Sequence, residues 1–231
     1  MISINFRYYL LIFSSVCFLS LHTRAQKIEV EEDEPNEVYA RIHPLRSMTL
    51  EVGLPIALKN NIFKQYMQGM IEISPSYHYT FKNFLTIGGG INYNYFWINH
   101  VLTSDSKNLG GIQSIGGFVS VGYEKFYTDR YGIDINVKIG PSKLIFDTDY
   151  NRKLDKLPSL NVLTIEPSVA FVVTADEQSS YRWIVSYANQ KYDFKSSLLG
   201  FDPGKLNANS TSSITQFLTI GFGYTYYIKQ R

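Results

Sequence analysis

Eight segments of the chain alternate between apolar and polar residues with a period of two. In residues 47–58 every even position is apolar, whereas the odd positions include Ser47, Thr49 and Glu51. A period of two places successive side chains on opposite faces of a β-strand, so each segment predicts a strand with one apolar face. The eight predicted strands are residues 47–58, 70–81, 85–97, 114–124, 131–141, 162–173, 181–188 and 214–228. The seventh has the weakest pattern, because Ile184 interrupts its polar face.

The composition of the polar faces separates a membrane barrel from a soluble β-sandwich, which would alternate in the same way. These faces are rich in Gly, Ser, Thr and Asn, and their charged residues are far apart. That composition is typical of the narrow, filled lumen of a small barrel. The apolar faces carry almost no charge, and the sequence contains no second layer that could cover them. We therefore predict an all-β protein, an eight-stranded antiparallel up-and-down transmembrane β-barrel.

The connections between the predicted strands alternate in length. The short ones are residues 82–83, 128–130 and 175–180, and the longer ones are centred on residues 60–61, 104–108, 147–157 and 193–212. Outer-membrane barrels have short turns on the periplasmic rim and long loops on the other rim. We therefore expect an outer-membrane location in a Gram-negative bacterium. Because the number of strands is even, both termini are expected in the periplasm.

Aromatic residues on the apolar faces gather near the ends of the predicted strands. Amphipathic rings favour the depth of the lipid headgroups, so these residues predict two aromatic girdles. The members are Tyr77, Tyr79, Tyr93, Tyr95, Trp97, Tyr123, Tyr131, Tyr181, Trp183, Tyr224 and Tyr226.

Prolines within the predicted strands test this interpretation, because a proline cannot donate a hydrogen bond to the neighbouring strand. They are Pro55, Pro75 and Pro167 inside strands and Pro141 at a strand end. We expect a bulge or a local break in strand pairing near them.

The first 25 residues have the features of a cleaved secretory signal. The apolar run 8–21 follows Arg7 and precedes Thr23-Arg24-Ala25, where small residues occupy the two positions that signal peptidase reads. The run is too short to cross a bilayer as a helix, which disfavours the alternative of a membrane anchor. Cys17 lies inside this run without a lipidation motif before it, so a lipoprotein is not expected.

Composition and charge exclude several classes of protein. With 45% hydrophobic and 15% aromatic residues the chain can bury enough apolar surface to fold, which excludes a disordered protein. Removal of the signal takes away two basic residues and the single cysteine, leaving equal numbers of basic and acidic residues. We therefore expect no nucleic-acid partner, no disulfide and no cofactor. His43 and His100 have no partner at metal-ligand spacing, so no metal site is expected either.

Residues 26–46 differ from the rest of the chain, because they are acidic and contain Pro35 and Pro44. A solvated disordered tail and a periplasmic segment that orders on a protein partner both agree with this composition. In the second case the contacts are Val38, Tyr39 and Ile42. The predicted organisation is thus a signal peptide at 1–25, an acidic periplasmic tail at 26–46 and an outer-membrane barrel at 47–228.

Polar residues on the predicted inner faces are candidates for a functional site. They are Glu51, Glu72, His78, Glu124, Asp134, Lys138, Glu166 and Arg182. An unpaired charge in a narrow lumen is costly, which favours a paired structural network over an ion path. His78, Ser76 and Glu72 have the residue types of a hydrolase triad, but they project from one strand instead of converging from several. We therefore expect no catalytic site.

The two longest predicted loops contain more large apolar residues than an inert surface needs. The candidate partner contacts in them are Phe146, Tyr150, Phe194 and Phe201. These loops are expected either to fold over the barrel mouth or to meet a protein partner.

Three short motifs give the chain a family resemblance. They are Arg24-Ala25-Gln26 at the cleavage site, Ile165-Glu166-Pro167-Ser168-Val169 at a strand start and Gly221-Phe222-Gly223-Tyr224-Thr225-Tyr226 in the last strand. With these motifs, residues 47–228 resemble the small outer-membrane β-barrel domain proteins of Bacteroidota-type bacteria, which are akin to OmpA/OmpX-like eight-stranded barrels. The chain departs from the pattern by ending on Lys229-Gln230-Arg231 instead of an aromatic residue, and we expect no peptidoglycan-binding domain after the barrel.

The sequence thus favours a non-enzymatic outer-membrane barrel with a structural or interaction role. The rigid barrel would contact outer-membrane lipid, while the long loops or the acidic tail would meet a protein partner. A more specific expectation is an accessory subunit of a larger envelope complex, for secretion or outer-membrane protein assembly. The alternatives are a narrow porin-like channel or carrier for a small or apolar solute, and an outer-membrane lipid hydrolase.

Overall fold

The computed structural model describes residues 45–99, 110–155, 157–176, 178–192, 194, 196–199 and 214–228. All of them belong to one of the two compact units of the chain, Val38–Arg231. The predicted signal peptide and the tail up to residue 44 lie outside the described residues. So do the predicted contacts Val38, Tyr39, Ile42 and Phe201.

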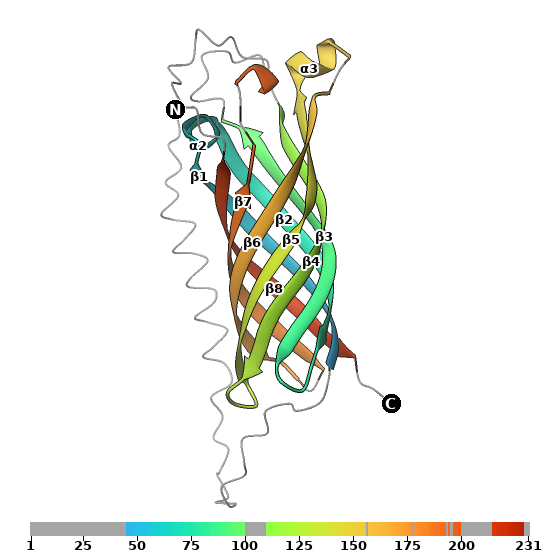
Figure 1. Cartoon of the computed structure of the whole chain (residues 1–231). Coiled ribbons are helices and arrows are strands. Elements are labelled where there is room, and N and C mark those ends of the chain that lie inside the picture. The colour runs from blue at the N-terminus through green and yellow to red at the C-terminus, as the bar shows by residue number, and fades with distance from the viewer. Residues whose placement is uncertain are drawn as a thin grey trace, which may run out of the picture. The chain divides into compact units, whose positions relative to one another are not determined.

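The described residues form a closed barrel of eight antiparallel strands in sequence order, as predicted (Figure 1). Each strand pairs with its neighbours along the chain, and β1 pairs with β8 to close the barrel. The strands are β1 (Leu45–Lys59), β2 (Met67–Thr80), β3 (Leu85–Ile98), β4 (Gly110–Phe126), β5 (Tyr131–Thr148), β6 (Ser159–Thr174), β7 (Ser179–Gln190) and β8 (Thr215–Ile228).

The two rims of the barrel differ. Short connections join β2 to β3, β4 to β5 and β6 to β7 at one rim, where β1 also begins and β8 ends. The opposite rim carries three short helices, namely α2 (Asn61–Tyr66), α3 (Asp149–Lys153) and the 3-10 helix η1 (Ser196–Leu199) (Figure 1). The connections are thus short at one rim and longer at the other, as predicted. None of the helices among the described residues is long and apolar enough to span a membrane.

Strand β5 runs further than the alternation predicted. It was expected to end at residue 141, but residues 142–148 continue to pair with β4, and the pairing with β6 continues to Ile145. Helix α3 begins directly after it, where the Thr148 hydroxyl accepts a hydrogen bond from the Asn151 backbone N–H at 3.2 Å and caps the helix. Phe146 therefore lies in a strand and not in a loop, which corrects its predicted position.

The outer wall of the barrel is an apolar band bounded by polar residues. On β1, Met48, Leu50 and Val52 are exposed, while the alternate residues Ser47 and Thr49 are buried in the lumen. Outward polar residues follow the last apolar positions toward the loop rim, and they are Lys59, Gln68, Gln113, Lys143, Asn161, Asn189 and Gln216. An exposed apolar wall with a polar edge toward the loop rim is the kind of surface that a bilayer requires.

Each proline within a strand coincides with a gap in pairing on one side of that strand, as expected. Pro75 pairs with Leu50 of β1, but the register between β2 and β3 skips it. Pro141 and Pro167 show the same one-sided gap toward β4 and β7. Pro55 pairs with β8, whereas the register between β1 and β2 ends at Gly53. The missing N–H of proline accounts for the loss of pairing on one side only.

Candidate functional site

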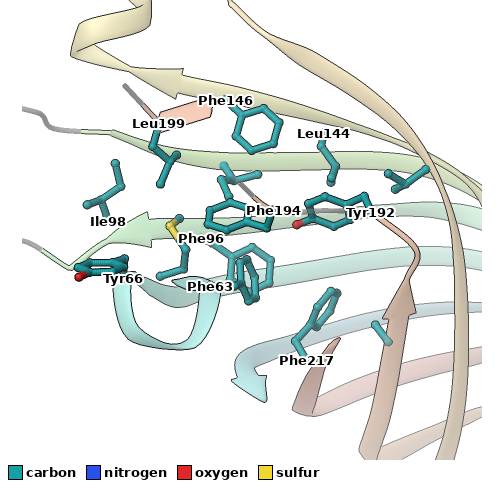
Figure 2. Packing of buried hydrophobic residues seen from close by; sticks show 14 residues of the cluster. Phe63, Tyr66, Phe96, Ile98, Leu144, Phe146, Tyr192, Phe194, Leu199 and Phe217 are labelled. Carbon is teal, nitrogen blue, oxygen red and sulfur yellow. The ribbon is translucent and has the colours of Figure 1, made fainter. Parts of the chain in front are cut away.

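The lumen is closed near the loop rim by an apolar cluster, which we call the mouth cluster (Figure 2). Its members are Phe63, Tyr66, Met67, Phe96, Ile98, Ile112, Leu144, Phe146, Val162, Ala188, Tyr192, Phe194, Leu199 and Phe217. Phe63 of α2 packs edge-on against Phe96 of β3 and Phe194, with ring centroids 4.9 and 5.6 Å away. The connection from β7 to β8 thus supplies side chains that fill the mouth together with α2 and the strand ends.

The strand ends form this cluster because their inner faces change from polar to apolar toward the loop rim. Leu144 and Phe146 of β5 point inward and are almost fully buried, in line with the polar Ser142 below them. The bulge in β2 between Gly69 and Ile71 likewise turns Met67 inward. The sequence signal is a run of consecutive apolar residues at a strand end, such as residues 96–98 or 144–146, where both faces are apolar.

Tyr192 lies outside the strands and belongs to the mouth cluster. Its side chain is almost fully buried, and this burial raises the pKa of its hydroxyl above the ordinary value for tyrosine. The Tyr192 hydroxyl therefore stays neutral at physiological pH.

Below the mouth cluster, Lys138 of β5 is the centre of a buried polar network. Its ammonium donates hydrogen bonds to Glu51 at 2.6 Å and to Glu166 at 3.4 Å. It also lies 5.3 Å from the centroid of the Phe118 ring, a favourable cation–π distance. Three strands, β1, β5 and β6, are thus joined across the lumen by one cation.

Glu72 and Glu166 are linked by a shared amide. The Asn92 side chain donates to Glu72 at 3.1 Å and to Glu166 at 3.3 Å. Glu72 also accepts a hydrogen bond from the Thr219 hydroxyl at 2.5 Å. Carboxylates in a narrow lumen need such donors, because an unsatisfied buried polar group is costly.

A second network surrounds Arg182 of β7 nearer the short-turn rim. The guanidinium donates to Asp134 of β5 and to Glu124 of β4, the latter at 2.6 Å. Glu124 also accepts a hydrogen bond from the Tyr227 hydroxyl at 3.0 Å. Tyr227 packs with Phe126 and Val172, and we call these three buried residues the lower closure.

The predicted lumen residues are thus brought together in these two networks, except that His78 joins neither of them. The Ser76 hydroxyl lies 2.8 Å from His78 Nε2, while Nδ1 of His78 has no hydrogen-bond partner among the described residues. Glu72 contacts Asn92 and Thr219 instead of His78. A serine and a histidine are therefore in contact, but no acid orients the histidine.

The lumen contains a small cavity. A cavity of about 10 Å³ lies between the mouth cluster and the Lys138 network, lined among others by Asn94, Thr164 and Gln190. This is room for about one water molecule. Within the described residues, no group of three or more His, Cys, Asp or Glu side chains is arranged to hold a metal ion.

Comparison with solved structures places this barrel beside small outer-membrane proteins. Neisserial surface protein A is similar with a TM-score of 0.51 and 9% identity, covering 78% of this chain and 96% of that one. Ail, the attachment invasion locus protein of Yersinia pestis, in complex with sucrose octasulfate has a TM-score of 0.46 and 10% identity, over 80% and 99% of the two chains. OprG from Pseudomonas aeruginosa has a TM-score of 0.42 and 10% identity, over 81% and 98%.

No family model matches the chain, and no curated protein matches its sequence. The likeness to Neisserial surface protein A, at such low identity, shows the fold alone. The chain has the closed eight-stranded fold of small outer-membrane β-barrels.

The predicted girdle residues all lie on the outer wall. Tyr77, Trp97, Tyr123, Tyr131, Tyr181, Trp183, Tyr224 and Tyr226 are exposed there, and Tyr79, Tyr93 and Tyr95 are partly covered by neighbours. The rings of Tyr181 and Phe222 stack at 5.6 Å, so part of the girdle is packed along the wall. Their depth in a bilayer remains a prediction.

Two of the four predicted loop contacts are buried instead of facing a partner. Phe146 and Phe194 belong to the mouth cluster, 0% and 1% exposed, so they fold over the barrel mouth, the other alternative that the sequence left open. Tyr150 of α3 is 47% exposed.

The hairpin of β5 and β6 projects beyond the apolar band. Lys143 and Asn161 face each other on its outer side, which marks the polar edge of the band. The residues beyond them lead to α3, which protrudes at the loop rim (Figure 1). Tyr150, Leu154 and Leu157 are exposed there, and we call these three residues the hairpin tip.

Proposed function

We propose that this chain is an outer-membrane β-barrel of a Gram-negative bacterium that acts as an interaction subunit, without conduction or catalysis. The outward apolar band and the fold support the membrane location. By analogy with such barrels, the short-turn rim faces the periplasm, so that the start of β1 and the end of β8 lie on that side. The loop rim with the hairpin tip then faces the outside of the cell.

The single observation that carries this proposal is the occlusion of the lumen. The mouth cluster fills one end, the lower closure fills the other, and the Lys138 and Arg182 networks lie between them. Eight strands leave an interior just wide enough for side chains. A barrel without a continuous water path acts through its surface instead of its lumen.

The hairpin tip is the surface best suited to a partner. Leu154 and Leu157 are 59% and 49% exposed, beyond the lipid-facing band where water surrounds them. Exposed apolar residues gathered at one place indicate a contact surface more often than inert surface. More specifically, we propose a protein partner on this side of the membrane and a place in an envelope complex for secretion or outer-membrane protein assembly. Membership of the Bacteroidota-type barrels is also proposed, on the motifs quoted above.

Planar-bilayer recording tests the occlusion. The purified barrel should give no reproducible conductance steps. A variant in which Phe63, Phe194 and Phe217 are all replaced by serine serves as the comparison, because it removes apolar side chains from α2, from the connection between β7 and β8, and from β8. Reproducible steps from the unaltered barrel would reject the proposal in favour of the narrow channel.

Crosslinking in cells tests the interaction role. A photo-crosslinking residue at Tyr150 should give a discrete adduct, and the same residue at Asp129 in a turn at the short-turn rim is the matched control. The adduct should disappear when Leu154 and Leu157 are replaced by serine. Equal labelling from both positions, or an adduct indifferent to the serine variant, would contradict the role of the hairpin tip.

The absence of catalysis needs its own test, because Ser76 and His78 are in hydrogen-bond contact. Lipid hydrolysis by the purified barrel should not exceed that of a His78→Ala variant. Hydrolysis that His78→Ala abolishes would establish the lipid hydrolase instead.

A further inference from the structure

An apolar groove of about 620 Å³ lies on the outer wall of the barrel, across the seam where β1 meets β2 and β8. Its lining includes Met48 and Leu50 of β1, Tyr77 of β2, Gly89 and Ile91 of β3, and Tyr226 of β8. Gly89, on the outward face of β3, opens it, because no side chain fills the space between Tyr77 and Ile91. Gly90 also lets β3 approach β2 closely, since a Cβ there would lie 2.3 Å from the Pro75 carbonyl oxygen.

The groove belongs to the apolar band and not to a rim. Its outward side chains from β1, β2, β3 and β8 are aliphatic or aromatic, and the polar Thr49 and Ser76 contribute from the lumen side of the wall. Tyr226 is held at one wall of the groove, where its hydroxyl donates a hydrogen bond to the Gln178 side chain at 3.1 Å. In a bilayer such a groove is surrounded by acyl chains, because water does not reach this depth.

Arg46 supplies a positive charge at one end of the groove. It is exposed and lies on the outer face of β1, two residues before Met48 and nearer the short-turn rim. Two residues of a strand span roughly 7 Å, so the guanidinium is at the depth of the headgroups while the groove runs toward the bilayer centre. Within the described part of the chain, the structure shows no ion pair for Arg46.

We propose that the groove and Arg46 form a binding site for a glycerophospholipid of the leaflet at the short-turn rim. One acyl chain lies along Met48, Leu50 and Ile91, and the guanidinium of Arg46 binds the phosphate, which it can contact with two parallel hydrogen bonds. The occupant follows from the combination of an apolar groove and a cation at its headgroup end. The proposal rests on the proposed membrane location of the barrel.

Two variants remove the two halves of the site separately. Gly89→Leu fills the groove, and it requires only a small local adjustment of β4, because a Cβ there meets only the Phe118 carbonyl oxygen, at 3.1 Å. Arg46→Gln removes the charge from an exposed side chain. The matched controls are Gly117→Leu, an outward glycine of β4 outside the groove lining, and Lys125→Gln, another outward cation near the short-turn rim.

Native mass spectrometry of the full barrel in detergent, titrated with dioleoyl phosphatidylglycerol, measures the binding. The unaltered barrel should show one saturable lipid adduct. Arg46→Gln should weaken it by roughly tenfold or more, because the charge-assisted hydrogen bonds to the phosphate are lost. Gly89→Leu should abolish it, and both controls should bind like the unaltered barrel. Glycerol phosphate, which has no acyl chain, should not compete.

Several outcomes would overturn the site. They are unaltered binding by Gly89→Leu and Arg46→Gln, equal loss in the two controls, or competition by glycerol phosphate. Heat-modifiable migration in gels establishes that each variant is folded before titration, and Arg46→Gln alone decides the matter if Gly89→Leu does not fold. Membrane fractionation of the same variants tests the proposed location separately, so failure of one inference is distinguishable from failure of the other.

Discussion

Replacing Lys138 by methionine should destabilise the barrel strongly, because it removes the cation from between Glu51 and Glu166. The Lys138 side chain is 5% exposed, and its partners are 16% and 2% exposed. Removing one partner of a buried ion pair costs about 3–5 kcal/mol, since the other charge is left in a low-dielectric interior. Methionine has a side chain of similar length, so the lost stability reflects the removal of the charge more than the creation of a cavity.

A double-mutant cycle with Glu51→Gln separates the interaction energy between Lys138 and Glu51 from the effect of each substitution on its other neighbours. Glu51 makes the shortest contact to Lys138, at 2.6 Å, so neutralising it should relieve part of the penalty. The double variant is therefore expected to be more stable than the sum of the single changes predicts, with a coupling of about 1–3 kcal/mol. Lys125→Met is the control, because Lys125 lies near Phe84 and Tyr127 at the rim and contributes about 1 kcal/mol or less there.

Urea unfolding in lipid vesicles measures these free energies. Trp97 and Trp183 lie on the outer wall, so their fluorescence reports the transfer of the wall out of lipid. Equal slopes of free energy against urea concentration are required for the comparison. A Lys138→Met barrel within about 0.5 kcal/mol of the unaltered one, or additivity in the cycle, would refute the assignment of a buried paired network.

Two further pairs of variants test the mouth cluster and the β1–β2 seam. Phe194→Ala should destabilise the barrel by up to about 3–5 kcal/mol and speed proteolysis at the loop rim, whereas Tyr150→Ala at an exposed site should change neither. Gly69→Ala should prevent folding of the barrel, because its Cβ would lie 1.7 Å from the Pro55 carbonyl oxygen. Gel migration of unheated samples distinguishes the folded from the unfolded form. Gly117→Ala, whose Cβ meets nothing nearer than 3.8 Å, should fold normally, and equal behaviour of the two glycine variants would contradict this reading.

The strands and their faces could be predicted because lipid and lumen impose opposite requirements on alternate residues. Met48 and Leu50 must be apolar to contact hydrocarbon, while Ser47 and Thr49 fill a polar interior, so the period of two is visible without homologues. The prediction failed where both faces are apolar. Phe146 was placed in a loop because β5 loses its alternation at residues 144–146, where the inner face joins the mouth cluster.

The partners inside the lumen could not be predicted from the sequence. Lys138 contacts Glu51 across the lumen although the two strands are not neighbours in the sheet. Such a contact depends on the tilt of the strands and on their register around the barrel, which alternation does not encode. The phospholipid groove was also not predictable, because it depends on which outward residues of four strands come to lie beside Gly89.

The mouth cluster and the outer wall are both apolar, but they respond differently to temperature. The mouth cluster is kept together by the exclusion of water, an effect that is almost entirely entropic near 25 °C and weakens on cooling. While the barrel stays in the bilayer, the outer wall contacts hydrocarbon, and local opening of the mouth cluster exposes none of that wall to water. Cooling should therefore weaken the contacts of Phe63, Phe194 and Leu199 while the wall keeps its surroundings. Local opening of the loop rim is expected to become easier in the cold, at temperatures where the barrel itself stays folded.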